Sequence, residues 1–457
     1  MSSINIGSSN LPYGSYTLSI YAIDKVGNII PPINRRLSTG FFGINHNNRI
    51  LSIRKYPHNY PSSQPPSVPF PNQSTVSTIL QDIKSMGLNA VRINMYWEAY
   101  RWYKSQRRAS TFINRLREIA STADSLGLGI LYNVMHQWKV SSVLYSSSSS
   151  TSRGVGFPEE CFIPLNLIPS GFHTTGNSYI YDQAIDGSSD INKIPKNIFW
   201  KAFATNYNVT IDGVTKGIWQ HIWDDYFRDV VLATKDYNST IGYELMNEPM
   251  EAVDNITTVE YQGLGNYYSF IAQNIRQLTA DKMIFFSELI SWRHNDAQIN
   301  SVYPDLAGKT AQYKKAELTA RLMLPRDKNG QIINGIAFSN TEYGKNGTFS
   351  ASQINQYNEY NRVFNNLKQS GIVTNLQTVF TEMNEQDPAQ GGTEPTTNTF
   401  INYLTILKER RYGWFYFNYD PNYPWSIKDS AYNDRKNSQG ITYKKMLIDA
   451  MQTVYRI

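Results

Sequence analysis

The sequence predicts an α/β protein built as a closed (β/α)8 barrel with a short N-terminal β-hairpin extension. From Gly40 onward, short apolar runs alternate with helix-length segments, and the alternation repeats eight times before the C-terminus. Helix-length connections between successive short strands produce right-handed crossovers and therefore a parallel sheet. Eight such units fit a TIM barrel, in which the chemistry takes place on loops at the C-terminal ends of the strands.

The individual elements follow from hydrophobic periodicity and from the glycines that end them. The expected strands are residues 41–45, 89–94, 129–135, 241–246, 283–286, 335–338, 377–380 and 413–417. The expected helices are residues 75–86, 112–126, 219–232, 267–278, 316–323, 352–369, 398–410 and 443–454. The helix at 316–323 has the weakest pattern, and it is needed to complete the count of eight.

Residues 1–38 have a different pattern and are assigned to an N-terminal β extension, whereas residues 39–457 form the barrel domain. Apolar residues alternate along 16–22 before a Lys-Val-Gly-Asn turn, which is typical of a hairpin strand. Two interpretations stay open for this extension. It is the remnant of an immunoglobulin-like module, with Pro31 and Pro32 as a linker, or a hairpin that covers the bottom of the barrel.

Composition argues against several classes of protein. The net charge is +6, but Lys and Arg are scattered in short pairs, so nucleic-acid binding is not expected. The single cysteine, Cys161, excludes an internal disulfide framework and a cysteine metal cluster. No run of about 18 apolar residues encodes a membrane span. The six histidines are dispersed and no HExxH motif occurs, so no metal or other cofactor is predicted.

Carboxylates, amides and aromatic residues follow most of the expected strands. In chain order these are Arg92, Asn94, Tyr96, Trp97, His136, Gln137, Trp138, Asn247, Glu248, Glu288, Glu342, Tyr343, Thr381, Glu382, Asn418, Tyr419 and Trp425. Because the C-terminal ends of parallel strands meet on one rim, these side chains should converge. The excess of aromatic residues (32 Tyr, 20 Phe and 9 Trp) also suggests a site that grips a partly apolar ligand.

Two motifs within this set resemble a known family. Asn247-Glu248-Pro249 follows the fourth strand and Phe380-Thr381-Glu382 closes the seventh, as in the family 5 glycoside hydrolases of clan A. Asn89-Ala-Val-Arg92 on the second strand and His136 on the third support the resemblance, which covers about residue 40 to the C-terminus. The segment IGYELMNEP and the aromatic-rich residues 199–227 are similar to the branch that includes endoglycoceramidases.

The resemblance implies a catalytic role for two glutamates. Glu248 corresponds to the acid/base and Glu382 to the nucleophile, while Asn247 would hold the sugar 2-hydroxyl. Arg92 would pair with Glu382, and Tyr343 would donate a hydrogen bond to it. Independently of any family, cleavage of a glycosidic bond needs one protonated carboxyl and one ionised carboxylate, about 5–5.5 Å apart in retaining enzymes. Two such close carboxylates cannot both ionise easily, so the pKa of one rises.

Further substrate contacts are expected from His136, Trp138, Trp414 and Trp425. The sequence departs from the family at two places. Thr341-Glu342-Tyr343 lacks the histidine common on the sixth strand, and Phe417 stands where a tryptophan is usual on the eighth, with Trp414 and Trp425 as substitutes. Several tryptophans should line an open groove, namely Trp97, Trp138, Trp292, Trp414 and Trp425. Glu288 and Glu342 are interpreted as solvated strand ends or hydrogen-bond partners rather than catalysts.

The function predicted first is a retaining, endo-acting β-glycosidase that hydrolyses a β-1,4-linked polysaccharide, glucan (cellulose) or mannan, by double displacement. A glycolipid-cleaving, endoglycoceramidase-like hydrolase is the alternative, although the C-terminal β-sandwich typical of that branch is missing from this sequence. A non-catalytic carbohydrate-binding barrel is the alternative from another class. The choice of substrate depends on the long insertion at 139–198. We expect a secreted, extracellular monomer, although residues 1–10 lack the layout of a signal peptide.

Overall fold

The computed structural model describes residues 15–23, 29–38, 42–46, 73–105, 107, 109–135, 157–167, 188–250, 253–291, 293–373, 376–419, 424–429 and 431–455. His136, Trp138 and Trp292 lie outside these residues, as do 139–156 and 168–187 of the long insertion.

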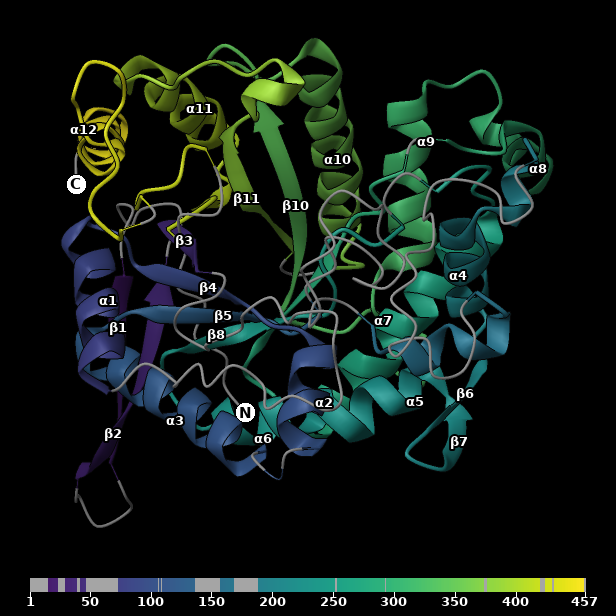
Figure 1. The fold of residues 1–457 in the computed structure, drawn as a ribbon, viewed down its shortest axis with the longest axis horizontal. Helices are drawn as coiled ribbons and strands as arrows, with labels where there is room; N and C mark the ends of the chain where they lie inside the picture. Colours follow the sequence, from purple (N-terminus) through teal and green to yellow (C-terminus); the bar gives the residue numbers. More distant parts are fainter. Residues whose placement is uncertain are drawn as a thin grey trace.

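Eight parallel strands form a closed barrel (Figure 1). They are β3 (Phe42–His46), β4 (Ala90–Asn94), β5 (Gly129–Asn133), β8 (Thr240–Glu244), β9 (Met283–Ser287), β10 (Ile336–Gly344), β11 (Leu376–Glu385) and β12 (Gly413–Tyr416). The order around the barrel is β10-β11-β12-β3-β4-β5-β8-β9, and β9 pairs with β10 to close it. The predicted barrel is confirmed. However, β10 and β11 extend several residues beyond the predicted ends, toward the rim.

Helices surround the strands (Figure 1). They are α1 (Gln73–Ser85), α2 (Trp97–Ser105), α3 (Ala109–Leu126), α4 (Pro195–Ala204), α5 (Ile218–Ile222), α6 (Arg228–Thr234), α7 (Thr258–Leu278), α8 (Asp296–Val302), α9 (Ala311–Leu318), α10 (Ala351–Gln369), α11 (Thr397–Glu409) and α12 (Tyr443–Tyr455). π-Helical turns at Trp223–Phe227 and Thr319–Met323 continue α5 and α9. Capping boxes start α7 and α10, at Thr257 with Glu260 and at Ser350 with Gln353.

The barrel interior has an apolar layer with a polar layer above it. The apolar layer consists of Ala90, Leu131, Phe285, Ala337, Val379 and Phe415, all at most 1% exposed. Two residues further along the strands come Arg92, Asn133, Ser287, Ser339 and Thr381. Because side chains two residues apart share a face of a strand, these polar residues also face the interior, at the C-terminal side where the site is expected.

Buried tyrosines from the surrounding helices account for part of the aromatic excess. Tyr226 donates to the carbonyl of Val134 at 2.7 Å, Tyr267 to that of Leu245 at 3.0 Å, and Tyr268 to that of Ser287 at 2.9 Å. Each of these carbonyls lies at or just beyond the C-terminal end of a barrel strand, where backbone pairing ends. The tyrosine hydroxyls therefore satisfy acceptors that would otherwise be buried without a donor. For these residues the aromatic content serves the core rather than ligand binding.

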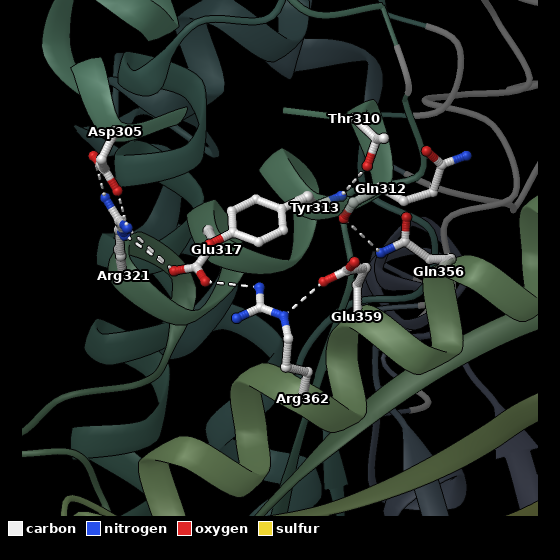
Figure 2. A network of polar contacts seen from close by, with 9 residues as sticks. All are labelled: Asp305, Thr310, Gln312, Tyr313, Glu317, Arg321, Gln356, Glu359 and Arg362. Carbon is white, nitrogen blue, oxygen red and sulfur yellow. Dashed lines mark hydrogen bonds and ion pairs between the residues drawn. The ribbon is translucent and has the colours of Figure 1, made fainter. Parts of the chain in front are cut away.

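Helices α9 and α10 are joined by a network of charged side chains, which Figure 2 shows. Arg362 of α10 contacts Glu317 of α9 at 2.9 Å and Glu359 at 2.7 Å, and its guanidinium lies 4.2 Å from the centre of the Tyr313 ring. Arg321 contacts Glu317 at 3.2 Å and Asp305 at 2.6 Å. Single surface ion pairs contribute little, but a connected set fixes the two helices against each other. Their buried faces carry Lys315 and Tyr360, which reach the end of β9.

The insertion between β5 and β8 is anchored by Arg101 of α2. This side chain contacts Glu160 at 2.6 Å and Asp212 at 3.0 Å. Glu160 lies in a short 3-10 turn, Glu159–Cys161, and another follows at Ile163–Leu165. A third 3-10 turn of the insertion is Ile191–Lys193, and two more occur later in the chain, at Pro304–Leu306 and Pro388–Gln390. Asp212 lies in the turn of an antiparallel hairpin, β6 (Asn208–Ile211) and β7 (Val214–Gly217).

The N-terminal strands β1 (Ser15–Ile23) and β2 (Ile29–Ser38) pair antiparallel. Pro31 and Pro32 lie within β2, so the interpretation of this pair as a linker was wrong. They lie opposite a register shift between Ile20 and Ala22. Proline lacks the N–H that a regular ladder needs, so such an irregularity is where it fits. In the described part of the chain, no helix is both long and apolar enough to span a membrane.

Candidate active site

Arg92 connects three parts of the barrel rim. Its side chain is fully buried in the interior. Nε donates to Oε2 of Glu244 at 2.6 Å, Nη1 to Oε1 of Glu382 at 2.8 Å, and Nη2 to Oδ1 of Asn247 at 2.6 Å. Burial disfavours the charge of Arg92, but the two carboxylates outweigh it and raise its pKa above the ordinary value. One guanidinium thus holds β4, β8 and β11 together.

Glu382 is a buried carboxylate of the rim, at 3% exposure. Besides the bond from Arg92, its Oε2 accepts a hydrogen bond from the Tyr343 hydroxyl at 2.7 Å. Both contacts expected at this carboxylate are therefore present. Burial raises the pKa of Glu382 above the ordinary value, while Arg92 and Tyr343 stabilise the ionised form and limit the rise. The result is a desolvated carboxylate with both oxygens held by donors.

A β-bulge turns Glu382 toward the interior. In the pairing of β10 with β11, Asn340 is opposite Phe380 and Thr341 is opposite Glu382, so Thr381 is the extra residue. Thr381 faces inward, where its hydroxyl lies 2.6 Å from that of Ser339. Successive strand residues normally point to opposite faces, and a bulge breaks this alternation. Thr381 and Glu382 can therefore both face the interior.

Glu248 lies in a tightly held turn directly after the residue that contacts Arg92. Its φ is +47°, a left-handed conformation that costs a non-glycine residue about 1 kcal/mol or more. Asn247 N donates to the carbonyl of Met135 at 2.9 Å, and the carbonyl of Pro249 accepts from Ile290 N at 3.2 Å. These bonds tie the turn to the segments that follow β5 and β9. Because Arg92 contacts both Asn247 and Glu382, the two glutamates belong to the same end of the barrel.

Asn247 presents a donor toward the site. Its Oδ1 is occupied by Arg92, whereas its buried Nδ2 has no acceptor among the described residues. A buried amide N–H without an acceptor costs free energy, which a ligand hydroxyl could recover. This position agrees with a contact to a sugar hydroxyl, which the family resemblance implies.

Glu244 and its hydroxyl partners were missed by the sequence analysis. Glu244 is fully buried and accepts from Arg92, from Ser339 Oγ at 2.5 Å and from Ser287 Oγ at 3.2 Å. It lies four residues before Glu248, within the segment IGYELMNEP. The position of Glu244 within the apolar part of the strand could have identified it, because a carboxylate at an interior strand position needs a buried partner.

Trp414 is not a substrate contact, contrary to the expectation. It is fully buried, and its indole N–H donates to the Tyr455 hydroxyl of α12 at 3.2 Å. The neighbouring Phe415 occupies the barrel interior, so alternation turns Trp414 outward. Trp97 is also fully buried, and Trp425 is 8% exposed with its N–H bound to the carbonyl of Gln386 at 2.9 Å. The three described tryptophans of the expected groove are therefore packing residues.

Phe417 takes the place where the family resemblance implies a tryptophan. Its ring meets that of Tyr343 edge to face, with centroids 5.8 Å apart, and it is partly exposed. The peptide bond that follows it, to Asn418, is cis. Phe417 is thus connected to Glu382 through Tyr343. It is a better candidate than Trp414 for contact with a sugar ring.

Glu288 and Glu342 face the helices rather than the barrel interior. Glu288 is 2% exposed and contacts Lys315 of α9 at 3.0 Å and Tyr360 of α10 at 2.9 Å. Glu342 accepts from Gln353 of α10 at 2.5 Å. Burial and the nearby charge of Glu288 raise the pKa of Glu342 to about 8. Both act as hydrogen-bond partners, as predicted, but Glu288 is not a solvated strand end. Among the described residues no cluster suited to a metal ion occurs.

Comparison with known proteins agrees with this arrangement. The sequence model of the cellulase family, glycosyl hydrolase family 5, matches residues 56–423. An endoglycoceramidase of Cyanea nozakii is 26% identical over 274 residues, which cover 57% of this chain and 50% of the relative. An endoglycoceramidase of Hydra vulgaris is 27% identical over 222 residues, covering 46% and 40%. The chain thus matches about half the length of these curated relatives.

The fold has a counterpart among solved structures. Endo-glycoceramidase II from Rhodococcus sp., solved as a lactosyl-enzyme intermediate, aligns over 94% of this chain and 80% of that one, with a TM-score of 0.55 and 15% identity. The same enzyme in a ganglioside GM3 complex aligns with a TM-score of 0.52 at 14% identity, over 95% and 81%. At these identities the likeness concerns the barrel. The family match covers most of the chain, and the chain belongs to glycosyl hydrolase family 5, whose members are glycoside hydrolases.

Proposed function

We propose that this glycoside hydrolase is a retaining endo-β-glycosidase that releases an intact oligosaccharide from a glycosphingolipid. The observation that carries the retaining mechanism is the state of Glu382, a buried carboxylate held by Arg92 and Tyr343 beside the Asn247–Glu248 turn. The lipid-linked substrate is supported by the two relatives, both of which are endoglycoceramidases.

The reaction follows from the different surroundings of the two glutamates. Glu382 attacks the anomeric carbon and forms a glycosyl ester, while Glu248 gives its proton to the departing oxygen. Glu248 then takes a proton from water, which attacks the anomeric carbon and releases Glu382. A nucleophile profits from desolvation and fixed donors, which Glu382 has. An acid/base must exchange protons with solvent, and Glu248 is partly exposed. Asn247 Nδ2 would bind the sugar 2-hydroxyl in the transition state.

A β-1,4-linked polysaccharide, glucan or mannan, is the second candidate substrate. The name of the family, cellulase, favours it. A long glucan needs a row of aromatic platforms, but the described tryptophans Trp97, Trp414 and Trp425 are all buried. Among the described residues the aromatic candidate at the site is Phe417, which suits a short glycan better than a polymer. For either substrate, we propose that the protein acts outside the cell as a monomer.

A substrate panel with product analysis tests the proposal. Lactosylceramide and ganglioside GM3 in detergent, carboxymethylcellulose and mannan would be incubated with the wild type and with Glu382→Gln as the inactive control. We expect free oligosaccharide and ceramide from the lipids, and no product from the variant. New reducing ends from cellulose or mannan alone would favour the second candidate. Binding to a glycan without turnover of any substrate would favour a non-catalytic carbohydrate-binding barrel.

A further inference from the structure

We infer that Glu244 is a positioning residue of the active site. By holding Nε of Arg92, it orients the guanidinium so that Nη1 bonds to one oxygen of Glu382 and Nη2 bonds to Asn247. The inference rests on the proposed function and adds a residue that acts through Arg92 rather than on the substrate. It follows from the contacts that Arg92 makes with Glu244, Glu382 and Asn247 and from the surroundings of Glu244.

The surroundings of Glu244 hold its carboxylate in one orientation. Oε2 accepts from Arg92 Nε at 2.6 Å, whereas Oε1 accepts from Ser339 Oγ at 2.5 Å and Ser287 Oγ at 3.2 Å. The donors come from β4, β10 and β9, so three strands fix one carboxylate. Such a buried charge stabilises a fold no better than apolar residues of similar size. Because the interior layer just below is apolar, packing gives no reason for a carboxylate here.

The geometry of arginine explains what Glu244 does. Two donors on one edge of a guanidinium match the two oxygens of a carboxylate, and this bidentate pairing is frequent. A bidentate Arg92–Glu382 pair would engage both oxygens of the nucleophile with the cation and would release Asn247. With Nε held by Glu244, Nη1 reaches Glu382 and Nη2 reaches Asn247. Oε2 of Glu382 is then left to Tyr343 and the reaction.

A second connection runs from Glu244 through hydroxyl groups to the nucleophile strand. Ser339 Oγ donates to Glu244 and lies 2.6 Å from Thr381 Oγ1. Thr381 is the bulged residue directly before Glu382. Glu244 is therefore linked to Glu382 along two paths, through the Arg92 side chain and through the backbone at Thr381. Both paths act on the orientation of the same carboxylate.

The charge of Glu244 predicts the direction in which the pKa of Glu382 changes when Glu244 is replaced. As a nearby anion it raises the pKa of Glu382, against the effect of Arg92 and Tyr343. Removing only the charge should therefore make Glu382 easier to ionise, whereas removing the anchor should misplace Arg92. A residue that merely fills the core would produce neither effect.

The test uses Glu244→Gln, which keeps the shape and an acceptor, and Glu244→Leu, which removes both. Thr240→Val is the matched control, because Thr240 is buried in the same strand and its hydroxyl donates to the carbonyl of Thr234 at 2.7 Å, away from the site. The measurements are kcat and KM on an activated aryl β-glycoside, the pH profile of kcat/KM, and labelling of Glu382 by a 2-deoxy-2-fluoroglycosyl fluoride. Thermal unfolding of each variant separates effects on folding.

We expect Glu244→Leu to lower kcat about 10- to 100-fold with little change in KM, because Arg92 loses a hydrogen bond between charged groups, and to slow labelling of Glu382 equally. Glu244→Gln should retain more activity and shift the acidic limb of kcat/KM to lower pH. If Glu244→Gln had the kcat and the acidic limb of the wild type, Glu244 would have no positioning role. Loss of stability in Glu244→Leu with the kcat of Thr240→Val would overturn the inference too. A wild type inactive on every β-glycoside would instead contradict the proposed function.

Discussion

Tyr343 and Glu382 are joined by a hydrogen bond of 2.7 Å from the phenol hydroxyl to Oε2 of the carboxylate. The rings of Tyr343 and Phe417 also meet edge to face, so the donor to Glu382 is itself supported by an aromatic contact. The two residues come from neighbouring strands, β10 and β11, at the part of each strand that extends beyond the predicted end. The extension of these strands is therefore what brings the Tyr343 hydroxyl to the Glu382 carboxylate.

Tyr343→Phe should lower kcat about 10- to 100-fold, because a hydrogen bond to an ionised group is worth roughly 1.5–3 kcal/mol. The ionised form of Glu382 loses a donor, so its pKa rises and the acidic limb of kcat/KM moves to higher pH. This direction is opposite to that expected for Glu244→Gln. The pH profiles of the two variants, measured together, check both signs. An acidic limb unchanged in Tyr343→Phe would show that this bond does not control the ionisation of Glu382.

The roles of the two glutamates can be separated by the leaving group. Glu382→Ala should be inactive on every substrate, because no glycosyl ester can form. Glu248→Ala should still form the ester from an activated aryl glycoside, whose leaving group needs no proton, and added azide should accelerate its turnover. Product anomers are followed by NMR. Rescue of Glu382→Ala with retained stereochemistry, or wild-type hydrolysis of a natural glycoside by Glu248→Ala, would reverse or remove these roles.

Asn247→Ala should lower activity more on a substrate that carries the sugar 2-hydroxyl than on a substrate that lacks it. The buried Nδ2 is placed to donate to that group, while Oδ1 is engaged by Arg92. We expect kcat/KM to fall about 10- to 100-fold on the normal aryl glycoside and by a smaller factor on its 2-deoxy analogue. The same factor on both substrates would mean that Asn247 acts through Arg92 alone.

Glu342 should make stability depend on pH in the neutral range. Its pKa is about 8 in the folded protein against an ordinary value of 4.5, so the folded state binds the proton more tightly than the unfolded state. The resulting stabilisation is complete below about pH 4.5 and is lost as the pH rises through about 8. Glu342→Gln, which can still accept from Gln353, should remove this loss. Since Glu342 is partly exposed, the difference should not exceed roughly 2–4 kcal/mol.

Urea unfolding at pH 5 and pH 9 measures the effect of Glu342 directly. Glu409→Gln is the control, because it makes the same charge change at an exposed side chain of α11. The wild type and Glu409→Gln should lose more stability between pH 5 and pH 9 than Glu342→Gln. Equal losses in all three proteins would show that Glu342 ionises normally and that the charge of Glu288 does not reach it.

Hydrophobic periodicity was sufficient to predict the barrel but not the full length of its strands. Residues 339–344 of β10 and 381–385 of β11 are mostly polar, so they resemble loop residues although they continue the strands. Most of their side chains are buried, and some are held by polar partners in the barrel, as Ser339 is by Thr381 and by Glu244 of β8. A sequence pattern detects burial against apolar partners, whereas it does not identify the partners of a buried polar residue.

The two glutamates proposed as catalytic were easier to single out from the sequence than the residues around them. Glu248 and Glu382 follow from strand position and motif, and Arg92 and Tyr343 make the contacts expected of them. Glu244 was overlooked, since its partners are distant in sequence. Trp414 was misplaced because its side depends on the alternation of one short strand, in which Phe415 takes the interior position. A shift of one residue in the predicted strand exchanges which of two neighbouring side chains faces the interior.

The side chains proposed to take part in the reaction and the insertion proposed to select the glycan lie on different segments of the chain. Arg92, Glu244, Asn247, Ser339 and Glu382 all come from strands or from the residues directly after them, and none comes from the insertion between β5 and β8. We therefore propose that exchanging that insertion would change the glycan recognised and leave the hydrogen bonds of Glu382 in place. Chimeras that graft insertions between distant relatives offer a practical route to new glycosidases on this scaffold.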